Sequence, residues 1–122
     1  DAAAIGAIAA LRKTVIPILG AEGKIDYDKK SKEKLPFSEE IIPLSFSFFK
    51  LGDSILLDPT REEEEACDAR VTFGISKWNG QYMINSCQKI GEATYTSEEI
   101  STIMKIIPEK FDELNKKLKK FL

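Results

Sequence analysis

The chain has 122 residues, a length typical of one domain or of part of one. Its 43% apolar and 31% charged residues are ordinary for a globular domain, and the absence of histidine removes the commonest general base and zinc ligand. A net charge of −2 gives no general attraction to nucleic acid or anionic membranes, and no apolar run approaches the roughly 18 residues of a membrane span, so we expect no membrane partner.

The opening DAAAIGAIAALRK predicts a helix from Ala2 to Lys13, within a leading segment 1–14, that stops before Pro17. Small apolar residues on almost every face of this helix favour burial all round. Because little else in the chain could cover it, and no initiator methionine precedes it, we expect the chain to be a piece of a longer polypeptide whose first half is missing.

After the helix, VIPILG predicts a short strand or extended segment, and residues 20–36 predict a polar, variable surface loop. The alternative for this loop is a basic contact with RNA phosphates, weakened by the acidic residues between the lysines. The lysines concerned are Lys24, Lys29, Lys30, Lys32 and Lys34.

Residues 37–90 predict strands with one buried face, because apolar residues alternate with polar ones. The inward residues of IIPLSFSFFK and RVTFGIS are Ile42, Leu44, Phe46, Phe48, Val71, Phe73 and Ile75. SILLD predicts a second strand, and Asn79-Gly80 predicts a tight hairpin turn into QYMINSCQKI. Four successive strands of this kind predict an antiparallel meander.

Residues 96–121 predict a final amphipathic helix that begins with a capping box of Thr96 and Glu99. Pro108 should kink or split it. Its expected apolar stripe is Ile100, Ile103, Met104, Ile107, Phe111, Leu114, Leu118 and Phe121. The lysines of its last turns suit a helix C-terminus, with a nucleic-acid or partner contact as the alternative. The predicted fold class is α+β, a four-stranded, mostly antiparallel sheet with helices packed on one face, as one domain over 1–122.

The two cysteines, Cys67 and Cys87, lack a CxxC spacing. We expect them to be reduced packing residues of a cytosolic or nuclear protein, with a disulfide or reactive thiol as the alternative.

The stretch ILLDPTREEEEACDARVTF, residues 55–73, contains four consecutive glutamates, Glu62 to Glu65. Such a run could hold a metal ion or perform acid–base chemistry, or it could form a solvated turn or a helix start. A metal site usually needs carboxylates that converge from different elements, and no other part of the sequence supplies a clear partner. The residues alone therefore favour the solvated turn or helix start, without a cofactor.

The stretch LGDSILLDPTREEEEACDARVTF, followed by a hairpin and QKIGEATYTSEEI, resembles the second half of the RNase PH domain. The resemblance spans nearly the whole chain except residues 20–36 and is strongest to ring subunits of the RNA exosome. Within them, FSFFKLGDSILLDPTREEEE is most similar to the polymyositis–scleroderma autoantigen type. The resemblance to the RNase PH domain implies a fold similar to that of ribosomal protein S5 domain 2.

Active members of this family carry two aspartates, six residues apart, that act as acid or hold a divalent metal. The corresponding positions here are Glu64 and Arg70. A guanidinium neither gives up a proton nor binds a cation, so the resemblance implies a degenerate site without catalysis or metal. Arg70 is expected to pair with Glu64, with Asp68 or with a neighbouring subunit. Asp58, Pro59 and Thr60 are expected to form a structural turn in which the aspartate caps free backbone N–H groups.

The resemblance implies a non-catalytic ring subunit that supports 3′-to-5′ RNA processing. Its partners would be other RNase PH-like subunits, RNA-binding cap proteins and single-stranded RNA in the channel, and its location the nucleus, nucleolus and cytoplasm. Two alternatives remain open: an active phosphorolytic 3′ exoribonuclease, and a small acidic domain that binds calcium or a basic partner.

Overall fold

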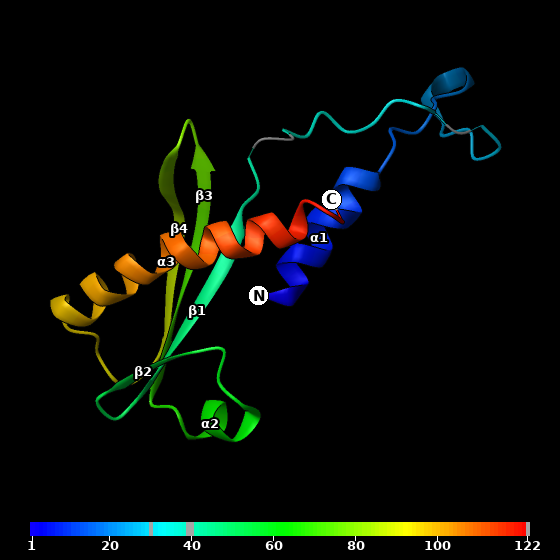
Figure 1. The fold of residues 1–122 in the computed structure, drawn as a ribbon. Coiled ribbons are helices and arrows are strands. Elements are labelled where there is room, and N and C mark those ends of the chain that lie inside the picture. The colour runs from blue at the N-terminus through cyan, green and yellow to red at the C-terminus, as the bar shows by residue number, and fades with distance from the viewer. Residues whose placement is uncertain (30, 39–40, 122) are drawn as a thin grey trace.

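The computed structural model describes residues 1–29, 31–38 and 41–121 and has the expected α+β fold (Figure 1). Its elements in chain order are α1 (Ala2–Lys13), a short 3₁₀ turn (Ala21–Gly23), β1 (Leu44–Leu51), β2 (Ser54–Leu57), α2 (Arg61–Ala66), β3 (Ala69–Trp78), β4 (Gln81–Gly91) and α3 (Ser97–Leu118). No helix of the described segments has the length and apolar character needed to cross a membrane.

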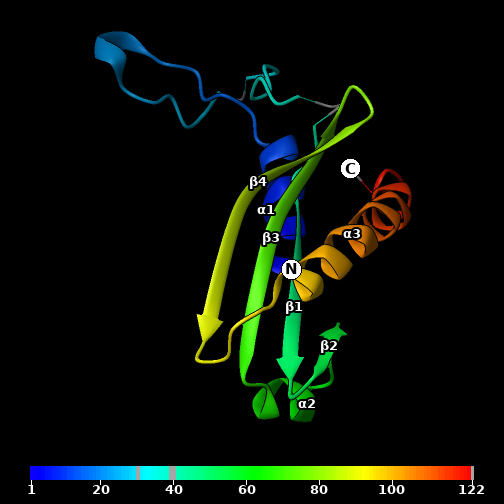
Figure 2. The ribbon, with the colours of Figure 1, turned by 90° about the vertical axis from the view of Figure 1, so that its left-hand side faces the viewer.

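The four strands are antiparallel, but their order in the sheet is β2-β1-β3-β4, so the predicted meander is wrong (Figure 2). β1 pairs with β2 along one edge and with β3 along the other. From β2, on one side of β1, the chain therefore continues through α2 to β3, which lies on the opposite side of β1. The strand region also begins later than predicted, at Leu44 instead of residue 37.

The predicted alternation of buried and exposed residues is confirmed. Residues 42, 44, 46 and 48, and 71, 73 and 75, are all buried in one apolar cluster. The Asn79-Gly80 turn is also confirmed, because both residues have positive φ, 49° and 78°. Gly80 suits this conformation because it has no Cβ.

The helix α3 supplies most of the cover for this apolar face. Ile103, Ile107 and Phe111 are buried in the same cluster, and the Phe111 ring lies 6.3 Å from Phe46 and 5.7 Å from Tyr82. The capping box is confirmed, since Thr96 accepts from Glu99 N–H and Glu99 accepts from Thr96 N–H. Pro108 lies inside the helix without splitting it.

The end of α3 differs from the prediction. The helix stops at Leu118, and Phe121 is 77% exposed instead of packed in the apolar stripe. Three more residues of helix would have been needed to bring Phe121 onto the buried side.

The first helix is less buried than its composition suggested, because Ile8 is the one residue of α1 that is buried. The chain then leaves the body of the molecule as an extended double arm (Figures 1 and 2). Isolated bridges between Val15 and Lys34 and between Leu19 and Ile25 join its two halves. This arm contains the predicted variable loop 20–36.

Candidate functional site

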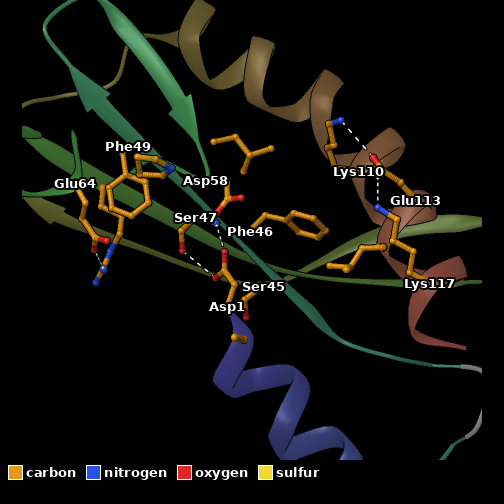
Figure 3. Close-up of a pocket in the computed structure, with 15 residues that line it drawn as sticks. Asp1, Ser45, Phe46, Ser47, Phe49, Asp58, Glu64, Lys110, Glu113 and Lys117 are labelled. Atoms are coloured by element: carbon orange, nitrogen blue, oxygen red, sulfur yellow. Dashed lines mark hydrogen bonds and ion pairs between the residues drawn. The ribbon is translucent and has the colours of Figure 1, made fainter. Parts of the chain in front are cut away.

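A hollow of about 460 Å³ lies where α1, β1, α2 and α3 approach one another (Figure 3). Its lining comes from several parts of the chain: the start of α1, residues of β1, the turn after β2, α2, the start of β3 and the second half of α3. Four of the residues singled out in the acidic stretch line it, namely Asp58, Pro59, Glu64 and Arg70.

The glutamate run forms α2, a helix of six residues that begins with its own capping box. The Thr60 hydroxyl accepts from Glu63 N–H at 3.3 Å, and the Glu63 carboxylate accepts from Thr60 N–H at 2.8 Å. Glu65 pairs with Arg61 one turn earlier. The glutamates thus lie around a short helix instead of converging, and the described residues contain no group of three potential metal ligands.

Thr60 is the residue that caps α2, so the capping role expected of Asp58 is corrected. Asp58 is exposed and has a left-handed backbone, with φ of 58°. Within the described parts of the chain its carboxylate makes no hydrogen bond. Pro59 follows and fixes the direction in which the chain enters the helix. The chain bends at Asp58, and this residue contributes its left-handed backbone conformation to the bend.

Arg70 pairs with Glu64, one of the three partners that the sequence left open, with 3.7 Å between Nη1 and Oε1. The contact joins one oxygen to one nitrogen and is not a two-pronged fork. The two side chains remain 41% and 52% exposed, respectively, which makes this a surface ion pair of small energy. The guanidinium also lies 5.8 Å from the centre of the Phe49 ring, close enough for a cation–π contact. A bound cation would need the Glu64 carboxylate as a ligand, and the Arg70 guanidinium lies directly beside that carboxylate.

The start of α1 is attached to the wall of this hollow by Asp1, which sequence reasoning missed. Its carboxylate accepts hydrogen bonds from Ser47 N–H at 3.1 Å and from the Ser47 hydroxyl at 3.0 Å (Figure 3). The Ser47 hydroxyl also lies 2.9 Å from the Thr72 hydroxyl. The one feature of the sequence that could have indicated this contact is the polar side of β1, where serines alternate with phenylalanines.

The opposite wall carries a second charged group that was also missed. Glu113 of α3 accepts hydrogen bonds from Lys117 at 2.7 Å and from Lys110 at 3.4 Å (Figure 3). The hydrogen bond from Lys117 is the main cause that lowers the pKa of the Glu113 carboxyl. The hollow thus holds both signs of charge, and three of its cations are already paired with carboxylates.

The remaining predicted sites lie away from the hollow or face solvent. Both cysteines are free, but Cys87 is exposed and is not a packing residue. In the arm, Lys24 pairs with Glu22 and Lys29 with Asp26, while Lys30 lies outside the described residues. The four loop lysines that the structure describes are not among the residues that line the hollow.

Comparison with known proteins gives this arrangement a context. The model of the 3′ exoribonuclease family, domain 2, matches residues 42–106, which include β1 to β4 and the first half of α3. Similar proteins include archaeal chains named exosome complex component Rrp42. The one from Methanothermobacter thermautotrophicus is 31% identical over 93% of this chain, that from Methanocella arvoryzae 32% over 97%, and that from Pyrococcus furiosus 32% over 95%. The chain covers 41% of the length of each of these relatives.

Proposed function

Because the chain belongs to the 3′ exoribonuclease family, of which it carries the second domain, we propose that it is part of a non-catalytic subunit of the RNA exosome ring. The proposal is supported by relatives named exosome complex components, which match nearly the whole chain. In such a ring the subunit assembles with other RNase PH-like subunits and RNA-binding cap proteins around a channel for single-stranded RNA. It supports 3′-to-5′ RNA processing through this assembly.

The observation that carries the non-catalytic part is the position of Arg70. Its guanidinium lies 3.7 Å from the Glu64 carboxylate. The sequence resemblance assigns to position 70 the second carboxylate of the active members. Because a guanidinium stays charged at every working pH, it supplies neither a proton nor a cation site. It also repels a divalent ion from Glu64.

The test uses the full-length protein that contains this chain, recovered from its source cells by an affinity tag. We expect other RNase PH-like subunits and cap proteins to co-purify in equal amounts. We also expect the isolated subunit to release no nucleotides from RNA when phosphate and Mg²⁺ are supplied. A subunit recovered alone or as a homo-oligomer contradicts the ring role.

One observation favours an active phosphorolytic exoribonuclease as the second candidate. Glu64 keeps its carboxylate, and Arg70, Lys110 and Lys117 line the same hollow as cations that suit phosphate. Phosphate-dependent RNA degradation that is lost in Glu64→Gln would establish this candidate. Equal RNA degradation by Glu64→Gln and the unaltered protein would assign the activity to a contaminating nuclease.

The type of ring subunit is a finer proposal. The stretch FSFFKLGDSILLDPTREEEE supports the polymyositis–scleroderma autoantigen type, located in the nucleus, nucleolus and cytoplasm. Cross-linking of the purified complex, followed by mass spectrometry, identifies the two neighbours in the ring. Neighbours that differ from those of the autoantigen type contradict this assignment.

A further inference from the structure

Positive charge is concentrated in the second half of α3 and the turn after it. Residues 110–121 contain five lysines and two acidic residues, in a chain whose net charge is −2. The rest of the molecule is therefore clearly acidic, and this end of α3 is a local basic surface. Such a surface attracts an anionic partner despite the overall charge.

Lysines from this part of α3 border two further hollows. The first, of about 410 Å³, is lined by Lys77 of β3 with Lys116, Lys119, Asp112 and Asn115. The second, of about 280 Å³, is lined by Lys116, Lys117, Lys120 and Glu113. Because Lys116 borders both, the two hollows form one continuous basic surface around the end of α3.

Three of these lysines have no carboxylate partner among the described residues, namely Lys116, Lys119 and Lys120. The others are neutralised, since Lys77 pairs with Asp112 at 2.8 Å and Lys117 with Glu113 at 2.7 Å. The unpaired ammonium groups are three and four residues apart on a helix and its last turn, a spacing that places neighbours on one side. They present three adjacent positive charges to solvent.

An exposed aromatic ring comes directly after these lysines in the chain. Phe121 is 77% exposed, and its backbone N–H donates to Leu118 O at 2.8 Å, which holds this residue in a continued turn after the helix. Surfaces that bind single-stranded nucleic acid combine lysines along the phosphates with aromatic rings on which bases stack. Lys116, Lys119, Lys120 and Phe121, together called the α3-end surface, provide this combination.

We propose that the α3-end surface binds single-stranded RNA, with the three lysines on successive phosphates and the Phe121 ring against a base. The proposal rests on the proposed function, which brings RNA to the complex. RNA fits this surface better than an acidic protein segment does. A base of RNA can stack on the exposed Phe121 ring, whereas a carboxylate interacts with the lysines alone. No sequence readout is expected, since every base offers a face for stacking.

The first experiment measures binding of a fluorescent single-stranded oligonucleotide RNA to the purified complex containing the full-length subunit. The variant is Lys116→Ala/Lys119→Ala/Lys120→Ala. Its matched control, Lys13→Ala/Lys89→Ala/Lys105→Ala, removes the same charge from exposed lysines elsewhere. Loss of three phosphate contacts should reduce the slope of log affinity against log salt by about 2 in the test variant, because each contact on a single strand contributes about 0.7.

The second experiment separates stacking from charge. Phe121→Ala should weaken RNA binding about 10-fold with the salt slope unchanged, while Phe121→Trp should preserve the affinity. Because all four side chains are exposed, the melting temperature of every variant should stay that of the unaltered protein.

Equal RNA affinity and salt slope in the triple variant and the unaltered complex would overturn the proposal. The proposal is also contradicted if the control variant weakens RNA binding as much as the test variant does. It is likewise contradicted if the test variant loses a protein partner and still binds RNA as the unaltered complex does. The ring role is tested by co-purification of ring subunits and not by RNA binding, so failure of the RNA test leaves the proposed ring role standing.

Discussion

Arg70 has two neighbours in the hollow, the Glu64 carboxylate at 3.7 Å and the Phe49 ring at 5.8 Å. The guanidinium and the carboxylate are both about half-exposed to solvent, which limits the energy of these contacts. A surface ion pair stabilises a fold by about 0–1 kcal/mol and an exposed cation–π contact by about 0.5–1 kcal/mol. The contacts of Arg70 thus add little to the stability of the fold.

The small energy of these contacts gives a prediction for Arg70→Ala. Urea unfolding should show a free energy of unfolding lower by about 1 kcal/mol, because both contacts are lost. Glu64→Gln removes the ion pair alone and should cost about half as much. A double-mutant cycle of the two separates the terms, and a coupling energy of zero would show that the pair contributes nothing.

The Glu99 carboxylate gives a residue-scale prediction that depends on pH. It accepts hydrogen bonds from Lys50, which is the main cause that lowers its pKa, and Lys50 also donates to Thr94 O. A lowered folded pKa stabilises the fold above the ordinary glutamate pKa of about 4.3, and this contribution disappears as pH falls through the folded pKa.

Glu99→Gln removes the charge and retains the ability to complete the capping box. At pH 7 its melting temperature should be about 3 °C lower than that of the unaltered chain. As the pH is lowered below about 4, the two melting temperatures should converge. A difference that is constant across this whole pH range would mean that the charge of Glu99 contributes nothing to stability.

At the scale of elements, α3 has two different parts. Ile103, Ile107 and Phe111 bury one side of its middle in the core, whereas the described residues after Leu118, 119–121, face solvent. The Tyr82 hydroxyl on β4 donates to Asp112 at 2.7 Å and lies 3.3 Å from Pro108 O, so the hairpin supports the helix near the proline. Core packing therefore continues along the inner side of α3 as far as the half-buried Leu118, while the residues of the α3-end surface face solvent.

Two phenylalanines on this segment test that division. Phe111→Ala should lower the free energy of unfolding by about 3–5 kcal/mol, because it leaves a cavity beside Phe46 and Tyr82. Phe121→Ala should change it by less than about 0.5 kcal/mol, because its ring is largely in solvent. Chemical denaturation of both variants checks this, and a large loss for Phe121→Ala would contradict its exposed position.

The elements also show what the sequence can and cannot predict. Strand alternation and the Asn79-Gly80 turn depend on neighbouring residues, so their prediction was confirmed. The strand order depends on which edge of β1 each partner takes, and the sequence holds no local signal for that choice. In the hollow, the Glu64–Arg70 pair lies within one short stretch and could be foreseen, whereas Asp1 and Ser47 are 46 residues apart and meet only through the fold.

At the scale of the whole molecule, the chain leaves much apolar surface uncovered along one edge of the sheet. β4 is an outermost strand of eleven residues, with Ile84 57% and Ile90 49% exposed on it and Trp78 half-exposed just before it. An edge strand presents unpaired backbone groups, and apolar residues beside them favour pairing with another chain. The relatives are more than twice as long, so in a longer chain this surface has further residues available to cover it.

The 122-residue chain alone should therefore self-associate through β4. Analytical ultracentrifugation should give a weight-average mass that rises above 13.7 kDa as concentration increases. Ile84→Lys/Ile90→Lys should return it toward the monomer, because charged residues on an edge strand oppose pairing. The matched control, Ser101→Lys/Thr102→Lys on the exposed side of α3, adds the same charge and should leave the association unchanged. If the control variant dissociates the chain equally, general charge repulsion explains the effect. If the unaltered chain is a monomer at every concentration, the prediction is wrong, and the polar residues of β4 protect its open edge sufficiently.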